Sequence, residues 1–387
     1  MNILITGAGG FLGQNLCKHL TAIIDDTNID NIFQCHRDTP IEQLSMYCKH
    51  ADFVFHFAGV NRVENVDTYH QNVHFTQLLV DQLQLHNNLA PIVYTSSVQA
   101  TLPENCNPYY GSSKKMAEEV LISHHKKTNA RIMIYRLPNV FGKWCKPNYN
   151  SVISTFCYNL ARDLPISIHN PETILELLYV DDFIKEMMSV LKTFQQQTDI
   201  YYNAHCTYRK TLSEIVTLLR SFAQIYNAHN LPPIHANTFE SKLCSTYVSY
   251  IPPHKLAFSL TSHSDDRGSF TELLRTDGSG QISLNRIKPG VTKGEHWHHS
   301  KWEIFTVISG CGSIALRSIV GSEILRYTVS TKELQSILIP PGYTHNITND
   351  SQERDLIALI WANEHYDLNA PDTYYEKVSL CSKITEN

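Results

Sequence analysis

A histidine-rich stretch in the last third of the chain constrains the fold most strongly. It contains Gly290-Val-Thr-Lys-Gly-Glu-His-Trp-His298, then Glu303, then Pro340-Pro-Gly-Tyr-Thr-His345. The side chains of His296 and His298, one residue apart, project to the same side of a β-strand. A carboxylate and a third imidazole on neighbouring strands can close a shell of nitrogen and oxygen ligands around a metal ion. The spacing therefore predicts a metal pocket built in β-sheet.

The same stretch resembles the two sequence boxes of the cupin family, Gly-x5-His-x-His-x4-Glu-x6-Gly and Pro-x-Gly-x2-His-x3-Asn. Every box residue is present, from Gly290 to Asn349. The resemblance implies a small double-stranded β-helix barrel and a defined set of metal ligands: His296, His298, Glu303 and His345. The alternative is a chance gathering in a chain with 20 histidines, which glycines and prolines at turn positions argue against.

The length and charge of the chain bound the remaining possibilities. A chain of 387 residues is long for one hydrophobic core, so two or three domains are expected. The net charge of -5 gives no electrostatic reason to bind nucleic acid or an anionic membrane. No apolar run is long enough to span a bilayer, and no signal-peptide core precedes the first strand pattern. The 10 cysteines contain no Cys-x-x-Cys pair, so we expect reduced thiols in a cytoplasmic protein.

A glycine-rich loop follows the first expected strand. Residues Asn2 to Thr6 form an apolar run, Gly7-Ala-Gly-Gly-Phe-Leu-Gly13 follows, and a helical pattern extends from Gln14 to Ile24. Glycines permit a tight turn and let backbone amides at a helix start approach a pyrophosphate. The loop predicts a dinucleotide site whose cofactor-binding residues are Gly7, Gly10, Phe11, Leu12 and Gly13.

Strand and helix patterns then alternate. Strands are expected at 32–35, 52–59 and 91–97, and helices at 70–86 and 112–124. This alternation predicts an α/β Rossmann-type domain, a parallel sheet with helices on both faces. The third strand ends in small residues, which places Ala58 against the cofactor. The second strand ends at His36-Arg37, and an arginine there can pair with the 2'-phosphate of NADP. We therefore expect NADP(H), unless Arg37 is an ordinary surface arginine.

A tyrosine and a lysine one helical turn apart supply the expected chemistry. In Tyr110-Gly-Ser-Ser-Lys114 the lysine charge can lower the phenol pKa, so that Tyr110 donates a proton near neutral pH. Ser97, at the end of an expected strand, would supply a second hydrogen bond to a reacting carbonyl. The downstream segment 143–150 is rich in aromatic and lysine residues, and it is either a site for a uracil base and a diphosphate or a surface loop.

The first part of the chain resembles the extended short-chain dehydrogenase/reductases. The matching motifs are Thr6-Gly-x-x-Gly-x-x-Gly13, His56-x-Ala-Gly59, Ser97, Tyr110-x-x-x-Lys114, Arg136-Leu-Pro-Asn139-Val-Phe-Gly142 and Tyr179-Val-Asp-Asp182. The resemblance implies a catalytic triad of Ser97, Tyr110 and Lys114, with Tyr110 and Lys114 also contacting the cofactor. The last two motifs resemble those of members that act on nucleotide sugars, and this implies substrate contacts from Ser97 and Asn139.

The helical pattern weakens before Pro252-Pro253, and shorter strand patterns follow. We therefore expect a reductase domain at 1–253 and a metal-binding cupin domain at 254–387. The segment Asp265-Asp-Arg-Gly-Ser-Phe-Thr-Glu272 resembles the substrate-binding segment of deoxysugar 3,5-epimerases, which implies that Arg267 grips a nucleotide diphosphate. Those enzymes use the histidine aligned with His296 as a base without metal.

The whole chain resembles bacterial capsular polysaccharide enzymes that join these two domains. Long matching strings include Phe141-Gly-Lys-Trp-Cys-Lys-Pro-Asn-Tyr149 and Pro371-Asp-Thr-Tyr374. The resemblance implies a homodimer with a zinc cupin that epimerises C-3 of a UDP-2-acetamido-2,6-dideoxy-4-hexulose. It further implies that the first domain reduces C-4 with NADPH to UDP-2-acetamido-2,6-dideoxy-L-talose, towards N-acetyl-L-fucosamine for capsule or O-antigen.

Three alternatives remain at this point. The cupin could be only a metal-stabilised binding or dimerisation module, or it could hold iron and act as an oxygenase. The first domain could also bind NADP as a redox sensor without turnover. The acid and base of the epimerisation are not identified, and Glu272, His365 and Tyr366 are candidates by residue type alone.

Overall fold

The computed structural model describes residues 1–26, 28–61, 66–103, 109–196, 198–228, 230–232, 235–276, 280–365 and 371–379. The chain divides into two compact units. Unit 1 comprises Met1–Ser221 and Ala236–Pro252, and unit 2 comprises Phe222–His235 and Pro253–Asn387. The grouping of 222–235 with unit 2 is a feature that the sequence pattern does not predict. No helix in the described ranges has both the length and the apolar character needed to cross a membrane.

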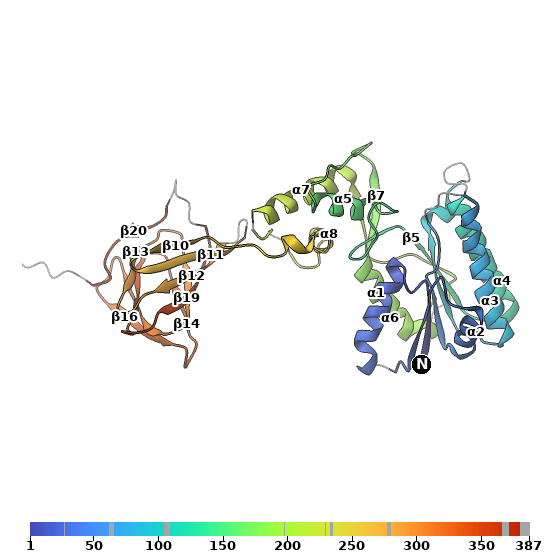
Figure 1. Ribbon diagram of the computed structural model, residues 1–387, viewed down its shortest axis with the longest axis horizontal. Coiled ribbons are helices and arrows are strands. Elements are labelled where there is room, and N and C mark those ends of the chain that lie inside the picture. Colours follow the sequence, from blue (N-terminus) through green and yellow to red (C-terminus); the bar gives the residue numbers. More distant parts are fainter. Residues whose placement is uncertain are drawn as a thin grey trace, which may run out of the picture. The chain divides into compact units, whose positions relative to one another are not determined.

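A parallel sheet forms the centre of unit 1 (Figure 1). Its strands follow the order β2-β1-β3-β4-β5-β8, and every pairing is parallel. Their bounds are β1 (Asn2–Thr6), β2 (Asn31–Cys35), β3 (Phe53–His56), β4 (Ile92–Ser97), β5 (Ile132–Leu137) and β8 (Tyr201–Tyr202). The strand order reverses between β1 and β3, and open α/β sheets bind ligands at the carboxyl ends of strands beside such a reversal.

Helices cover both faces of this sheet, as Figure 1 shows. On one face lie α1 (Phe11–Ile23) and α6 (Val180–Thr193), and on the other α2 (Ile41–His50), α3 (His70–Leu85) and α4 (Tyr110–Thr128). Ile3 and Ile5 of β1 are buried with Leu16 of α1, whereas Leu4 is buried with Leu44 of α2. Because strands buried on both faces are apolar at every position, the sequence reads as short apolar runs. The predicted Rossmann-type sheet is confirmed.

A smaller three-stranded sheet extends unit 1. It contains β6 (Asn139–Phe141), β7 (Ile174–Tyr179) and β9 (Thr207–Thr211) in the order β6-β7-β9. The helices α5 (Val152–Leu160) and α8 (Phe239–Val248) contact one another, and α7 (Leu212–Asn227) begins in unit 1 and ends in unit 2. Short 3-10 turns are η1 (Ile24–Asp26), η2 (Val66–Tyr69), η3 (Val98–Thr101), η4 (Phe194–Gln196) and η5 (Pro253–Lys255).

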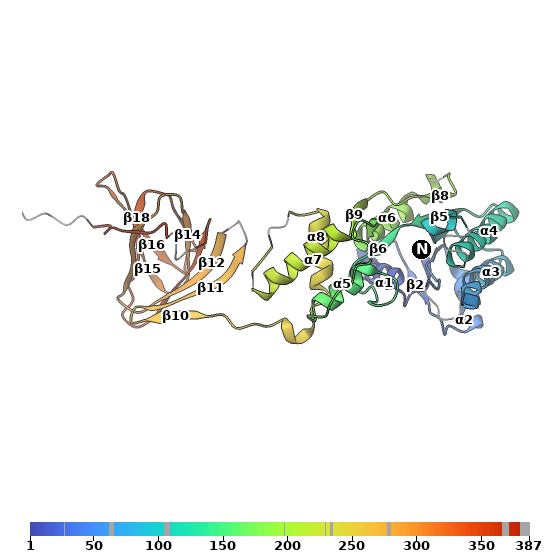
Figure 2. The same ribbon diagram turned by 90° about the horizontal axis from the view of Figure 1, so that it is seen from above.

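Unit 2 contains two antiparallel sheets. The first has the order β10-β11-β12-β19-β14-β17, and the second β16-β15-β18-β13-β20. The bounds are β10 (Ser262–Asp265), β11 (Gly268–Thr276), β12 (Gly280–Ile287), β13 (Thr292–Trp297), β14 (Glu303–Ser309), β15 (Cys311–Ser318), β16 (Ile324–Ser330), β17 (Ser336–Ile339), β18 (Tyr343–Asn349), β19 (Leu356–Ala362) and β20 (Tyr374–Tyr375). Figure 2 shows the long strands β11 and β12 side by side.

The core of unit 2 lies between these sheets. Phe305 of β14 and Ala358 of β19 are buried with Ile314 of β15 and Ile347 of β18. Alternate residues along each strand face this core, so the apolar positions recur with a period of two. The predicted all-β cupin barrel is confirmed.

Candidate active site and metal centre

The glycine loop is shaped by close contact with the end of β3. A Cβ atom on Gly7, whose φ is +69°, would lie 2.7 Å from the Cα atom of Ala58. A Cβ atom on Gly13 would lie 2.1 Å from the carbonyl oxygen of Gly7. Larger residues therefore cannot occupy these positions without moving the backbone. Among the described residues no side chain caps the start of α1, so the amides of its first turn are available to an anion.

Two cavities meet at this loop. One, of about 760 Å³, is lined by Gly7, Gly10, Arg37 and Ala58. The other, of about 560 Å³, shares Gly7 and Gly10 with it. Its wall also contains the remaining predicted residues of this unit: Phe11, Leu12, Gly13, Ser97, Tyr110, Lys114 and Asn139. The fold thus brings the predicted cofactor, catalytic and substrate residues of unit 1 together at the carboxyl edge of the sheet.

Tyr110 lies at the start of α4 and faces the end of β4. Burial raises the pKa of its phenol to about 12, although a hydrogen bond with Ser97 opposes the rise. This differs from the expectation that Lys114 lowers the phenol pKa. The ammonium of Lys114 instead donates to the carbonyl oxygen of Thr95 at 2.9 Å and lies 4.8 Å from the centre of the Tyr94 ring. Tyr110 therefore keeps its proton at neutral pH.

Lys114 is buried close to a second charged group, Glu118, which the sequence motifs did not indicate. Burial lowers the pKa of Lys114 to about 8, and the carboxylate of Glu118, one helical turn later, opposes this. Glu118 accepts hydrogen bonds from Ser96 Oγ at 2.5 Å and from Arg136 Nη2 at 2.6 Å. The spacing of four residues after Lys114 on a helix is the signal that could have identified it.

His56, the first residue of the His-x-Ala-Gly motif, is buried, and both of its ring nitrogens contact threonine hydroxyls. Its Nδ1 atom is 2.7 Å from Thr6 Oγ1 and its Nε2 atom is 2.9 Å from Thr76 Oγ1. Burial lowers its pKa to about 3, and the charge of Lys114 acts in the same direction. A neutral His56 therefore links β1, β3 and α3 under the glycine loop.

The aromatic and lysine segment after β6 lies at the second cavity. Trp144, Lys146 and Tyr149 line it, and Trp144 has a positive φ of 68° with half of its side chain exposed. The ammonium of Lys143 pairs with the carboxylate of Asp181. These side chains therefore line the same cavity as Tyr110 and Lys114.

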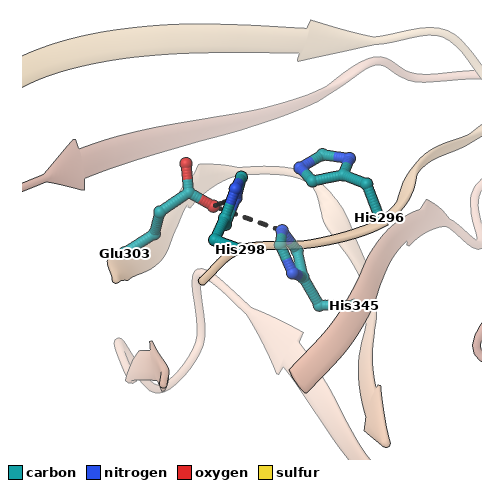
Figure 3. A group of neighbouring side chains, drawn as sticks. All are labelled: His296, His298, Glu303 and His345. Carbon is teal, nitrogen blue, oxygen red and sulfur yellow. Dashed lines mark ion pairs between the residues drawn. The ribbon is translucent and has the colours of Figure 1, made fainter. Parts of the chain in front are cut away.

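In unit 2 the four predicted metal ligands converge (Figure 3). His296 of β13 lies directly opposite His345 of β18 in the strand register, and Glu303 is the first residue of β14. One nitrogen or oxygen atom of each side chain lies within 4.8 Å of the others. Glu303 Oε2 is 3.2 Å from His345 Nε2 and 3.5 Å from His298 Nε2. These atoms lie close enough to surround one ion.

The polar atoms of this cluster face one another, and among the described residues three of them have no hydrogen bond. Within the described residues, His298 Nε2, His345 Nε2 and Glu303 Oε2 are buried without a hydrogen bond. Leaving a buried polar group unpaired costs about 1–3 kcal/mol, and more for a charge. His298 Nδ1 donates to the main-chain oxygen of Asp372, so Nε2 carries the lone pair. A divalent cation would satisfy all three atoms, and the donor set fits one.

The protonation states agree with cation binding. Burial would raise the pKa of Glu303, but the neighbouring imidazoles of His298 and His345 hold it well below its usual range. Burial, reinforced by His345, lowers the pKa of His296 to about 4. At neutral pH the cluster therefore presents an ionised carboxylate and a neutral His296, the forms that coordinate a metal.

The other predicted residues of unit 2 lie in ion pairs or main-chain contacts. The exposed guanidinium of Arg267, between β10 and β11, donates to the carboxylate of Asp265 at 2.7 Å. Glu272 pairs with Arg275 at 3.0 Å, and His365 Nε2 lies 2.9 Å from the carbonyl oxygen of Thr276. Tyr366 lies outside the described residues. This arrangement does not single out an acid or base for proton transfer.

Comparisons with known proteins match both units. Residues 3–204 match the NAD dependent epimerase/dehydratase family, and residues 263–374 match the polysaccharide biosynthesis C-terminal domain. A curated Pseudomonas aeruginosa protein, UDP-2-acetamido-2,6-beta-L-arabino-hexul-4-ose reductase, is 35% identical over 375 residues, which cover 97% of this chain and 98% of the relative.

Two solved structures are similar to this chain over nearly its whole length. The crystal structure of the capsular polysaccharide assembling protein CapF from Staphylococcus aureus has a TM-score of 0.85 and 42% identity, covering 97% of this chain and 100% of that one. A second CapF structure, with the inhibitor 3-isopropenyl-tropolone, has a TM-score of 0.81 and 39% identity over the same shares. The chain therefore belongs to the NAD dependent epimerase/dehydratase family, and its second unit is a polysaccharide biosynthesis C-terminal domain.

Proposed function

We propose that this chain is a bifunctional nucleotide-sugar enzyme. Unit 2 epimerises C-3 of a UDP-2-acetamido-2,6-dideoxy-4-hexulose, and unit 1 reduces the C-4 ketone with NADPH to UDP-2-acetamido-2,6-dideoxy-L-talose. The product leads towards N-acetyl-L-fucosamine in capsule or O-antigen synthesis. The observation that carries the proposal is that Ser97, Tyr110 and Lys114 line one cavity with the glycine loop. The described activity of the Pseudomonas aeruginosa relative supports the same substrate class.

Reduction follows from the groups at the end of β4. NADPH, held at the glycine loop by residues such as Gly7, Gly10 and Gly13, would supply a hydride to C-4 of the sugar. Ser97 donates a hydrogen bond to the ketone oxygen and holds it beside Tyr110. As negative charge develops on that oxygen, the neutral phenol of Tyr110 gives up its proton to form the alcohol. The ammonium of Lys114 stabilises the phenolate that results.

Epimerisation is assigned to the metal cluster of unit 2. A divalent cation held by His296, His298, Glu303 and His345 would stabilise negative charge on the C-4 oxygen when C-3 loses its proton. The protein supplies an ionised Glu303 and a neutral His296, and it buries His298 and His345 beside them. We propose zinc as the ion because nitrogen and carboxylate ligands in this number suit it. Iron in its place, measured by elemental analysis, would favour an oxygenase instead.

The decisive experiment is incubation with a UDP-2-acetamido-2,6-dideoxy-4-hexulose in deuterated water, followed by NMR. Without NADPH, deuterium should enter at C-3, and with NADPH a talose derivative should form. Reduction without deuterium entry would show that unit 2 is only a metal-stabilised binding or dimerisation module. NADP binding without reduction of any 4-ketone would show that unit 1 is a redox sensor.

We also propose that the enzyme works as a homodimer in the cytoplasm, in line with its expected reduced thiols and nucleotide-sugar substrate. Sedimentation velocity on the full chain tests the oligomeric state. A single species with the mass of one chain at working concentration would contradict the dimer.

Replacing Arg37 with aspartate should shift cofactor preference from NADPH to NADH. Arg37 follows β2 and lines the cofactor cavity, where a guanidinium suits a 2'-phosphate and a carboxylate suits a ribose hydroxyl. We expect the ratio of the NADPH and NADH dissociation constants, measured by fluorescence titration, to change in favour of NADH by about 10-fold or more. A change of this size corresponds to the loss of one charge-assisted hydrogen bond to the phosphate. An unchanged ratio would show that another residue reads the phosphate. Lys18→Ala, on the exposed face of α1, is the matched control.

The kcat/KM for reduction should fall as the pH rises through about 8, because burial lowers the pKa of Lys114 in the free protein to about this value. Below this pH the ammonium is present, and above it the charge that stabilises the phenolate is lost. Glu118→Gln removes the carboxylate that raises the Lys114 pKa, so the fall should move to lower pH. Lys115→Gln, an exposed neighbour on α4, should leave the profile unchanged. Identical profiles in the wild type and Glu118→Gln would contradict this assignment.

A further inference from the structure

A short segment near the end of the described chain lies against the strands that carry the metal ligands. We call residues 371–379 the C-terminal strap. Its strand β20 pairs with β13, so that Tyr375 lies opposite His296 and Tyr374 opposite Trp297. The ring of Tyr374 stacks on Trp297 with a centroid distance of 4.9 Å. The strap is thus part of the sheet that holds His296, the residue two positions before His298.

Asp372 of the strap contacts both the imidazole of His298 and the main chain of the three residues that follow it. Its main-chain oxygen accepts the hydrogen bond from His298 Nδ1. Its carboxylate accepts hydrogen bonds from the amides of His299 at 2.8 Å, Ser300 at 2.8 Å and Lys301 at 2.9 Å. These amides form the turn between the ligands His298 and Glu303. One residue therefore orients an imidazole ligand and secures the turn that leads to the carboxylate ligand.

A second contact supports His296. The preceding residue, Glu295, has a positive φ of 61°, which is uncommon outside glycine, and it lies where the register between β13 and β18 shifts. Its carboxylate accepts from Asn346 Nδ2 at 2.8 Å and from the amide of Val378 in the strap at 2.7 Å. Bulges of this kind re-aim a neighbouring side chain. The strap thus holds the bulge from which His296 points into the cluster.

A third set of contacts reaches the strand of His345. Thr344 Oγ1 donates to the main-chain oxygen of Glu376. The buried guanidinium of Arg317, on the neighbouring strand β15, donates to the main-chain oxygens of Val378 at 2.9 Å and Lys377 at 2.9 Å. The strap is therefore tied to each segment that carries a histidine ligand.

We propose that the C-terminal strap positions the metal centre and that Asp372 is its principal positioning residue. Asp372 points Nε2 of His298 towards the ion and holds the turn that sets the separation of His298 from Glu303. This inference rests on the metal centre of the proposed function. Its consequence is that metal affinity and ligand geometry depend on a residue that does not itself coordinate the ion.

The test uses the full chain with Asp372→Ala, Asp372→Asn and a control, Asp355→Ala. Asp355 is in the same barrel, and its carboxylate pairs with Arg286. Asp372→Ala keeps the main-chain oxygen that accepts from His298 Nδ1, but it removes the carboxylate that fixes this oxygen against the amides of residues 299–301. Competition with a chromophoric chelator should therefore show zinc affinity about 10–100-fold lower in Asp372→Ala, the usual loss when the support of a ligating histidine is disturbed. Asp372→Asn keeps one acceptor oxygen and should lose less, while Asp355→Ala should match the wild type. The visible spectrum of the cobalt-substituted protein should change in Asp372→Ala, which loss of stability alone does not produce.

The possible outcomes distinguish the existence of the metal centre from the positioning role of Asp372. A wild-type protein that binds neither zinc nor cobalt would contradict the metal centre itself. A wild type that binds both, with Asp372→Ala matching its affinity and cobalt spectrum, would overturn the positioning role. Should Asp372→Ala fail to fold, Asp372→Asn decides, because its affinity must fall below that of Asp355→Ala for the inference to stand.

Discussion

Tyr110→Phe should abolish most hydride transfer, with a rate lowered by about 10²–10⁴-fold, the usual contribution of a positioned general acid. Phenylalanine keeps the ring that packs 5.8 Å from the ring of Tyr69, but it has no proton to give to the developing alkoxide. The cofactor loop is untouched, so the NADPH dissociation constant should stay close to that of the wild type. Single-turnover loss of NADPH absorbance with a UDP-4-hexulose measures the first quantity, and fluorescence titration the second.

The control for this variant is the adjacent residue of the same type. Tyr109 is about half exposed and precedes α4, so Tyr109→Phe should reduce the ketone at the wild-type rate. Reduction by Tyr110→Phe at a near wild-type rate would remove Tyr110 as the proton donor. Equal losses in both variants would point to damage of the loop rather than to chemistry.

Removing two metal ligands should stop proton exchange at C-3. The double variant Glu303→Ala with His345→Ala deletes the carboxylate and the fully buried imidazole of the cluster. Electrostatic stabilisation by a metal ion contributes several kcal/mol to such a step, so exchange should fall by at least about 10²-fold. NMR of the substrate in deuterated water without NADPH measures the exchange, and elemental analysis should find the ion gone.

NADPH binding in this variant should remain, since the cofactor cavity lies wholly in unit 1. His263→Ala, an exposed histidine on β10 of the same barrel, should keep both metal and exchange. If a folded, metal-free double variant takes up deuterium at the wild-type rate, the metal-assisted epimerase proposal is wrong.

Much of the fold could be predicted because its determinants are local. The run Asn2–Thr6 was expected as a strand and is β1, and the helix expected at 70–86 is α3 (His70–Leu85). Burial on both faces makes such strands continuously apolar, and turn residues end them. The glycine loop could also be predicted from the sequence. The contact of Gly7 with Ala58 leaves no space for a Cβ atom, so the loop requires glycine at this position.

The electrostatics of the reductase site could not be predicted in the same way. The spacing of Tyr110 and Lys114 suggested a lowered phenol pKa, yet burial raises it to about 12. The lysine ammonium is directed to the carbonyl of Thr95, and Glu118 lies beyond it, held by Arg136. A pKa depends on how deeply a group is buried and on which charges face it, and neither is encoded in a spacing of four residues.

The metal cluster shows which features the sequence predicts and which only the tertiary structure reveals. A strand period of two predicted that His296 and His298 share a side, because this inference requires no knowledge of the rest of the barrel. The resemblance to the cupin boxes then implied that Glu303 and His345 complete the set. Only the folded barrel showed Asp372 against His298, 74 residues away along the chain. The role of Asp372 follows from its hydrogen bonds. These bonds form only because the strap packs against the segment of His298 in the folded barrel.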